Sequence, residues 1–200
     1  MSALPQFAAL DGVAAVDAVD PASDATLIAF AVRPVVVPLR PPRQTEAGLM
    51  LTAPLILLDI ETANGIVGHA YVFTHTSLVL RSVVQLMHDM LPLLGGQRLD
   101  PARNVASLRA RLAAVDTPGL VEMALAGIAV ALWDAQAKMT GQPFEWTAAP
   151  ALLRSAAYAR LLAHAGLAEA VLAEPLGASE GCGPGMGIVW NQAAIRQFSV

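Results

Sequence analysis

The pattern of apolar and polar residues is clearest over residues 52–76, where two apolar runs flank an Asn-Gly pair. Asn64-Gly65 between β-rich segments predicts a tight hairpin turn of type I′, which needs positive φ at both central residues. In the first run the side chains alternate, and the residues of the two faces are Ile56, Leu58 and Ile60, and Leu57, Asp59 and Glu61. Period-two alternation is typical of a half-buried strand, so this stretch predicts a β-hairpin.

Residues 26–39 precede the hairpin and are rich in β-branched side chains, which favours a third strand. Pro34 and Pro38 cannot donate to a sheet ladder, so this strand is expected at an edge or with a bulge. Residues 40–51 predict a loop long enough to be functional. Residues 1–25 have no firm period and predict a weakly ordered leader, with a short helix over 12–19 as the alternative.

Three helices are predicted after the hairpin, over residues 77–94, 101–115 and 117–139. Asp100 with Pro101 gives the second a cap and a favourable first residue, and Gly141 follows the end of the third. The third carries a narrow stripe of mostly small residues, namely Leu120, Met123, Gly127, Ala131 and Ala135. Such a stripe lets another backbone approach closely, so we expect this helix to lie flat on the sheet.

The character of the sequence changes after Pro143. Residues 150–173 are rich in alanine and leucine and predict helix interrupted at Gly166, followed by a glycine-rich turn and a last short strand at 188–190. The fold class predicted for the whole chain is α+β. It consists of a three-stranded antiparallel meander, a three-helix bundle, and a C-terminal helical segment with a tail that folds back.

Composition excludes several classes of protein. The chain of 200 residues is 56% hydrophobic, its net charge is −4 and Lys138 is its one lysine, which argues against a nucleic-acid partner. No stretch of about 18 charge-free apolar residues predicts a membrane span. The single cysteine, Cys182, excludes an internal disulfide, and with no visible secretory signal it favours the cytoplasm.

Isolated chemical signals are weak. Asp59 and Glu61 lie two apart on one strand face, which suits either a metal pair or, in our preferred interpretation, a solvent-exposed face. His69 is interpreted as a packed or hydrogen-bonded strand residue and His164 as a helix-surface residue. Asp134 and Lys138 are spaced for an i,i+4 ion pair worth a few tenths of a kcal/mol.

Several longer motifs, in order, carry a resemblance. They are VPLRPPRQTEAG, TAPLILLDIETANGIVGHAYVFTHT and LVEMALAGIAVALWDAQAKMTGQP, followed near the end by VLAEPLG and GPGMGIVWNQAAIRQFSV. Together they resemble the mandelate racemase/muconate lactonizing enzyme family of the enolase superfamily. The resemblance covers residues 28–143, which correspond to the family's N-terminal capping domain, and returns in the C-terminal tail.

The resemblance implies a domain division and a missing part. Residues 26–143 correspond to an enolase-like N-terminal domain, and residues 144–200 to a junction, a helical segment and the tail of a deleted barrel domain. In the family that barrel carries a Lys-x-Lys pair, three magnesium-binding carboxylates and a His-Asp dyad, and it belongs between about residues 143 and 160. One lysine cannot make the pair. Ala129 also departs from the family's acidic residue in a Gly-Ile-Asp motif.

By resemblance, two capping loops would contact substrate, residues 40–51 and 72–76. Arg43 and Met50 on the first, and His75 on the second, stand where relatives line the pocket. An Arg and a His there suit a polar or acidic substrate. The alternative is that these are solvated loop side chains in a protein without a pocket.

Two functions follow as expectations. The first is a remnant of a mandelate racemase-like isomerase or acid-sugar dehydratase, catalytically inactive as this chain, with no cofactor of its own although full-length relatives use Mg²⁺. Only those relatives would bind a small-molecule acid. The second is a homo-oligomeric interaction module, or a partner of a full-length paralogue, which uses the apolar surface that would face the barrel and is left bare without it.

Overall fold

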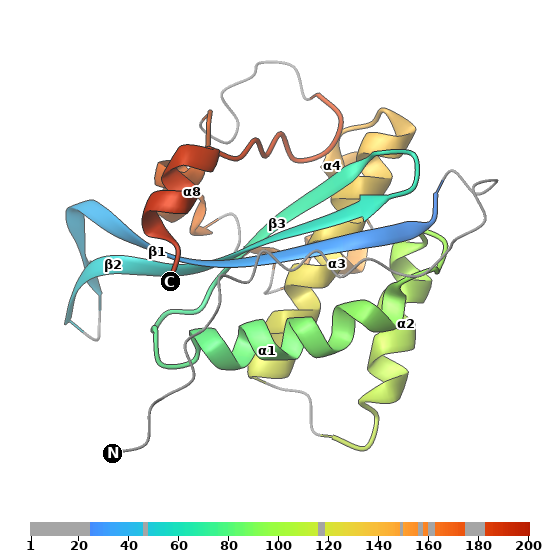
Figure 1. The fold of residues 1–200 in the computed structure, drawn as a ribbon, viewed down its shortest axis with the longest axis horizontal. Helices are drawn as coiled ribbons and strands as arrows, with labels where there is room; N and C mark the ends of the chain where they lie inside the picture. The colour runs from blue at the N-terminus through green and yellow to red at the C-terminus, as the bar shows by residue number, and fades with distance from the viewer. Residues whose placement is uncertain are drawn as a thin grey trace.

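The computed structural model describes residues 25–45, 48–115, 119–148, 150–155, 158–159, 163–174 and 183–200 (Figure 1). Its centre is a three-stranded antiparallel sheet in the order β1-β2-β3. The strands are β1 (Leu27–Thr45), β2 (Gly48–Thr62) and β3 (Val67–Phe73). The meander is therefore confirmed, and β1 occupies an edge, as its two prolines predict. The leader at 1–24, Cys182 and the Thr117-Pro118 start of the third helix lie outside the described residues.

The β2–β3 hairpin is confirmed, but its turn type is not. Gly65 has φ 79°, and among the described residues outside glycine only His75 has positive φ, so Asn64 does not fit a type I′ turn. Gly65 N donates to Thr62 O, and Thr62 N donates to Ile66 O. This is the pattern of a three-residue turn with glycine in the left-handed position.

Residues 40–51 are not the loop that the sequence predicts. β1 continues to Thr45 and β2 starts at Gly48, and the pairs Arg43–Met50 and Thr45–Gly48 extend the ladder into a two-stranded ribbon. The register shifts between Pro38 and Arg43. We call residues 40–51 the ribbon; it projects from one end of the sheet (Figure 1). A local sequence period does not reveal this structure, because it depends on pairing between two strands.

Three main helices follow the sheet, namely α1 (Leu80–Met90) with its 3₁₀ extension η1 (Leu91–Leu94), α2 (Pro101–Arg111) and α3 (Leu120–Thr140). Asp100 caps α2 as predicted, because its side chain accepts from Arg103 N at 3.1 Å. Gly141 ends α3 in the left-handed conformation with φ 67°. Further short helices occur beyond α3, so three is not the full number.

α3 lies flat on the sheet, as its small-residue stripe predicts. A Cβ on Gly68 of β3 would lie 2.0 Å from Ala131 O, and a Cβ on Gly127 of α3 would lie 2.5 Å from Val72 Cγ2. Backbone therefore approaches backbone here, which only glycine permits. α3 is also long and apolar enough to cross a membrane by length and composition, but its contacts with β3, α1 and α2 give it the character of a core helix.

The later elements are short. They include α4 (Phe144–Thr147), α5 (Pro150–Leu153), α7 (Ala165–Ala168), η2 (Glu169–Val171) and α8 (Gln192–Phe198). Helix α7 runs through Gly166, so the predicted interruption is wrong at that position. Residues 188–190 form no strand; Trp190 makes an isolated bridge with Leu172. We call residues 183–200 the tail, and it does fold back onto the sheet (Figure 1).

Both faces of the sheet are covered, which corrects the expectation of a half-buried strand. Val72 and its face neighbours meet α3, while the opposite side chains of β2 and β3, Leu55, Leu57 and Tyr71, are also at most 2% exposed. Their cover includes the tail and α7, which contact β1 from the side away from α3. β2 is thus buried on two faces rather than half-buried.

The described chain also covers parts of both sheet edges. On β1, Val35 bridges to Ser199, and Val200 N donates to Pro34 O. At the other end of the same edge, Leu27 N donates to Gln97 O. On β3, His69 N and Val67 O are bonded by side chains of α3. Open edges invite pairing with other chains, so this closure favours a self-contained unit.

Candidate functional site

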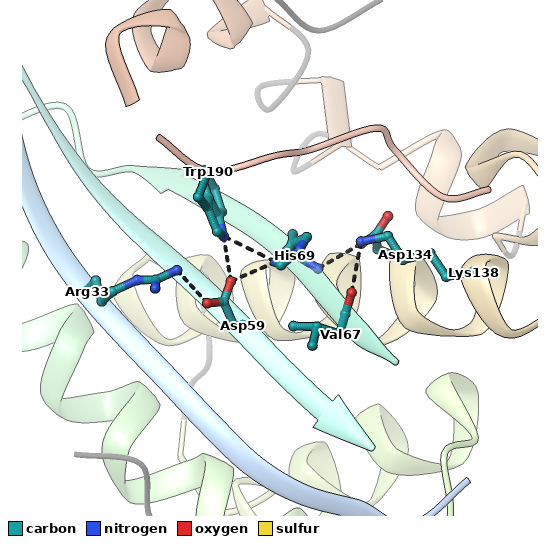
Figure 2. A network of polar contacts seen from close by, with 7 residues as sticks. All are labelled: Arg33, Asp59, Val67, His69, Asp134, Lys138 and Trp190. Carbon is teal, nitrogen blue, oxygen red and sulfur yellow. Dashed lines mark hydrogen bonds and ion pairs between the residues drawn. The ribbon is translucent and has the colours of Figure 1, made fainter. Parts of the chain in front are cut away.

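The most elaborate polar cluster lies where the tail crosses the sheet (Figure 2). Asp59 of β2 faces His69 of β3 in the ladder, and its Oδ1 lies 2.7 Å from His69 Nδ1. Trp190 of the tail donates its Nε1–H to the same Oδ1 at 2.6 Å, and Arg33 of β1 donates to Oδ2. One carboxylate therefore joins all three strands to the tail.

The cluster orients the His69 ring. Trp190 Nε1 can only donate, and it lies 2.6 Å from Asp59 Oδ1 and 3.1 Å from His69 Nδ1. Nδ1 of His69 is thus held between the Asp59 carboxylate and the Trp190 N–H. The ring then packs edge-on against Trp190 with centroids 5.6 Å apart, and the Arg33 guanidinium carbon lies 5.9 Å from the Trp190 ring.

The pKa of Asp59 is set by opposing effects. Burial alone would raise it, but the hydrogen bond from His69 and the charges of Arg33 and His69 outweigh burial, and Trp190 adds to them, so the pKa of Asp59 falls below its ordinary value of 3.8. The carboxylate stays ionised at neutral pH and all its donors belong to this chain. It is engaged in structure and is not a base ready to take a substrate proton.

Asp134 of α3 makes a second junction, next to the first. It is fully buried, and its carboxylate accepts from His69 N and Met186 N, each at 2.7 Å. Lys138 Nζ lies 2.7 Å from it and also donates to Val67 O. The predicted i,i+4 pair is confirmed, but it is a buried junction between helix, strand and tail and not the surface pair that the spacing suggests (Figure 2).

The sequence interpretation that Asp59 lies on a solvent-exposed strand face is therefore wrong, since its side chain is only 16% exposed. The hydrogen-bonded interpretation of His69 is confirmed. The described residues contain no group of three or more His, Cys, Asp or Glu side chains arranged to hold a metal ion.

The residues expected to face substrate lie near one end of the sheet. Arg43 and Met50 are opposite each other in the ribbon, Arg43 exposed and Met50 partly buried against the core. His75 follows β3, is exposed, and has φ 61°. Its ring lies 4.5 Å from that of Phe73.

A segment that sequence reasoning left aside contacts two of these three residues. The ring of His164 lies 4.7 Å from Phe73 and 5.4 Å from His75, and Gly166 lies beside the Arg43 guanidinium. His164 is therefore not the simple surface residue that its sequence position indicates. No local pattern signals this contact, because it joins residues about 90 positions apart.

Comparison with known proteins agrees with this architecture. Residues 27–145 match the family model of the mandelate racemase/muconate lactonizing enzyme N-terminal domain. An enolase from Bradyrhizobium, complexed with magnesium and mandelic acid, is similar at 32% identity and TM-score 0.58, over 62% of this chain and 34% of that one. An enolase from the alpha proteobacterium BAL199 with bound magnesium has 34% identity and TM-score 0.56, over 60% and 33%.

The L-talarate dehydratase from Polaromonas, complexed with magnesium and L-glucarate, shares the fold at 23% identity and TM-score 0.53, over 60% of this chain and 33% of that one. The matched region and its sheet-and-helix fold define an enolase-superfamily N-terminal domain. The chain belongs to the mandelate racemase/muconate lactonizing enzyme family. It spans about a third of the length of the solved relatives that it matches.

Proposed function

We propose that this chain is the capping part of a mandelate racemase-like protein and that it does not catalyse the family's reaction by itself. The family match over residues 27–145 carries the proposal. Only residues 146–182 separate that match from the tail. This segment is too short to form the barrel that holds the family's acid/base groups. The proposed setting is the cytoplasm.

The one lysine supports inactivity. Proton abstraction next to a carboxylate needs a free base near the substrate. Lys138 instead bonds Asp134 and Val67 O on the α3 side of the sheet, with its side chain 21% exposed. It cannot serve as half of a Lys-x-Lys pair, and the sequence supplies no other lysine.

The test is α-proton exchange in D₂O, followed by proton NMR with mandelate or L-glucarate, magnesium and the purified chain. We expect no exchange above buffer. The Polaromonas L-talarate dehydratase, assayed on L-talarate, is the positive control for the reagents. Magnesium-dependent exchange that co-elutes with this chain on size exclusion, at constant specific activity, would overturn the proposal.

A second candidate is an interaction module, either a homo-oligomer or a partner of a full-length paralogue. Its support is three exposed leucines, two on the ribbon and one in the segment after β3: Leu49 is 61% exposed, Leu51 59% and Leu78 90%. Apolar side chains exposed this far favour association when they are contiguous.

Light scattering after size exclusion tests the second candidate. A defined dimer that dissociates in the Leu49→Lys, Leu51→Lys double variant would support it. Val115→Lys is the matched control, because Val115 is 54% exposed and follows α2, away from the ribbon. A monomer at high concentration, with no complex on adding a full-length family member, would contradict it.

A further inference from the structure

Residues 164–169, which we call the strap, lie against two separate parts of the proposed capping surface. The strap comprises His164, helix α7 and the first residue of η2. The strap is packed into the core on one side: Leu167 and Ala168 are at most 2% exposed, and Val171, just beyond it, is fully buried. His164 lies against the segment after β3, and Gly166 lies against the ribbon.

The first contact joins the strap to the segment after β3. Three rings meet there: His164 lies 4.7 Å from Phe73 and 5.4 Å from His75, and Phe73 and His75 are 4.5 Å apart. The His75 and His164 planes are nearly perpendicular, at 86°. Edge-on and tilted ring contacts at these distances are attractive. His75 also holds φ 61°, a conformation that its surroundings must favour over its alternatives.

The second contact joins the strap to the ribbon. A Cβ on Gly166 would lie 2.8 Å from Arg43 Nη2, so the guanidinium occupies the space that a side chain at 166 would take. Glu169 Oε1 lies 3.5 Å from the same point. A carboxylate of this chain therefore sits in the neighbourhood of Arg43, which is where the capping role would bring the carboxylate of an acid.

We propose that the strap is an intramolecular contact that holds the ribbon and the segment after β3 together by packing against Arg43 and His75. A small acid approaching these two residues has to displace the strap first. The meaning of this contact rests on the capping role proposed above. The contact itself does not, so it is tested without substrate or catalysis.

The test is hydrogen–deuterium exchange with mass spectrometry on the full chain, comparing wild type with His164→Ala. Loss of the ring contacts is expected to speed amide exchange about three- to tenfold in peptides covering residues 40–51 and 74–79, since local opening there becomes easier. Peptides from α3 should be unchanged. His164→Phe keeps an aromatic ring and is expected to restore wild-type exchange.

Arg196→Ala is the matched control, because Arg196 is exposed on α8 and contributes to neither contact. Unchanged exchange in both target regions of His164→Ala would overturn the strap. So would an equal rise in Arg196→Ala, or a uniform rise that includes α3, since either would show a general loss of stability. Catalytic exchange by the chain would overturn the proposed function and leave this result standing.

Discussion

The two faces of the sheet are joined to their covers by different kinds of contact. On one face α3 packs closely against β3 through Gly68, Gly127 and alanines, and at the β3 edge Asp134 and Lys138 of α3 also bond the β3 backbone. The tail is joined through two carboxylates, Asp59 on the other face of the sheet and Asp134 at the β3 edge, each with at least three donors. Apolar packing tolerates small shifts, whereas a buried carboxylate needs every donor in place. The packing of the tail on the sheet should therefore be more easily disrupted by a single substitution than the packing of α3.

The largest expected effect is at the junction of helix, strand and tail. Asp134→Ala removes the buried charged partner of Lys138 and the acceptor of two backbone N–H groups, so we expect a loss of about 3–5 kcal/mol in unfolding free energy. Urea denaturation followed by circular dichroism measures it. Asp89→Ala, at an exposed position on α1, is the control and should change stability by less than about 0.5 kcal/mol. Equal losses in the two variants would contradict the junction's importance.

The glycine contact on the helix side comes next. Gly68→Ala places a methyl group against Ala131 O and Ala135, so α3 must shift, and overpacking of this kind costs about 1–3 kcal/mol. The same denaturation experiment applies. Gly183→Ala is the matched control, since nothing lies within 4 Å of a Cβ there. A Gly68 variant as stable as wild type would show that α3 does not lie as closely on β3 as described.

Trp190→Phe tests the first junction alone. The change keeps a ring but removes the donor to Asp59, and we expect a loss of about 1 kcal/mol in unfolding free energy. Amide exchange should rise in the tail before it rises in α3. In an Asp59→Asn background the same change should cost less, because the charged acceptor is gone; additive losses would argue against a direct coupling.

Low pH should weaken the junction at Asp59. Because the folded-state pKa of Asp59 lies below its ordinary value of 3.8, ionised Asp59 contributes stability that is present above pH 3.8 and is lost as the pH falls through the folded pKa. Denaturation midpoints measured from pH 6 downward should therefore decline less steeply in Asp59→Asn than in wild type. Parallel curves would contradict this origin.

The smallest effect is expected on the helix side, at the surface pair of Arg109 and Glu122. Its two hydrogen bonds are 2.9 and 2.7 Å long, and Glu122 raises the pKa of Arg109, but the side chains are 46% and 43% exposed. Solvent screening keeps such pairs below about 1 kcal/mol. Glu122→Gln should shift stability by less than about 0.5 kcal/mol, and a loss as large as that of Asp134→Ala would remove the contrast between the two faces.

The helix-covered face was largely predictable because its signals are local. Alternation in β2, the glycine of the hairpin, the Asp100 cap and the small-residue stripe of α3 each act over a few residues. The tail-covered face was not, since Trp190 and Asp59 are 131 positions apart and neither is unusual in its own neighbourhood. The exposed-face interpretation of Asp59 failed for that reason, and the role of His164 was missed for the same one.

The ribbon shows a second limit. Its two prolines and its polar residues indicate a loop, and each strand of it taken alone has no β period. It becomes a ladder because Arg43 and Met50 pair at the end of a register already set by the longer strands. The candidate site residues could thus be named from the family resemblance, whereas their arrangement and their contact with residues 164–169 required the structure.

The closed edge of β1 has a consequence for the fate of the protein in a cell. Ser199 and Val200 bond the outer side of the strand next to Pro34 and Val35. Loss of these contacts would uncover donors and acceptors on a long, apolar strand, and such strands template fibrous aggregates. Freeing residues 199 and 200 from β1 would then change the solubility of the chain well before it changed the stability of the core.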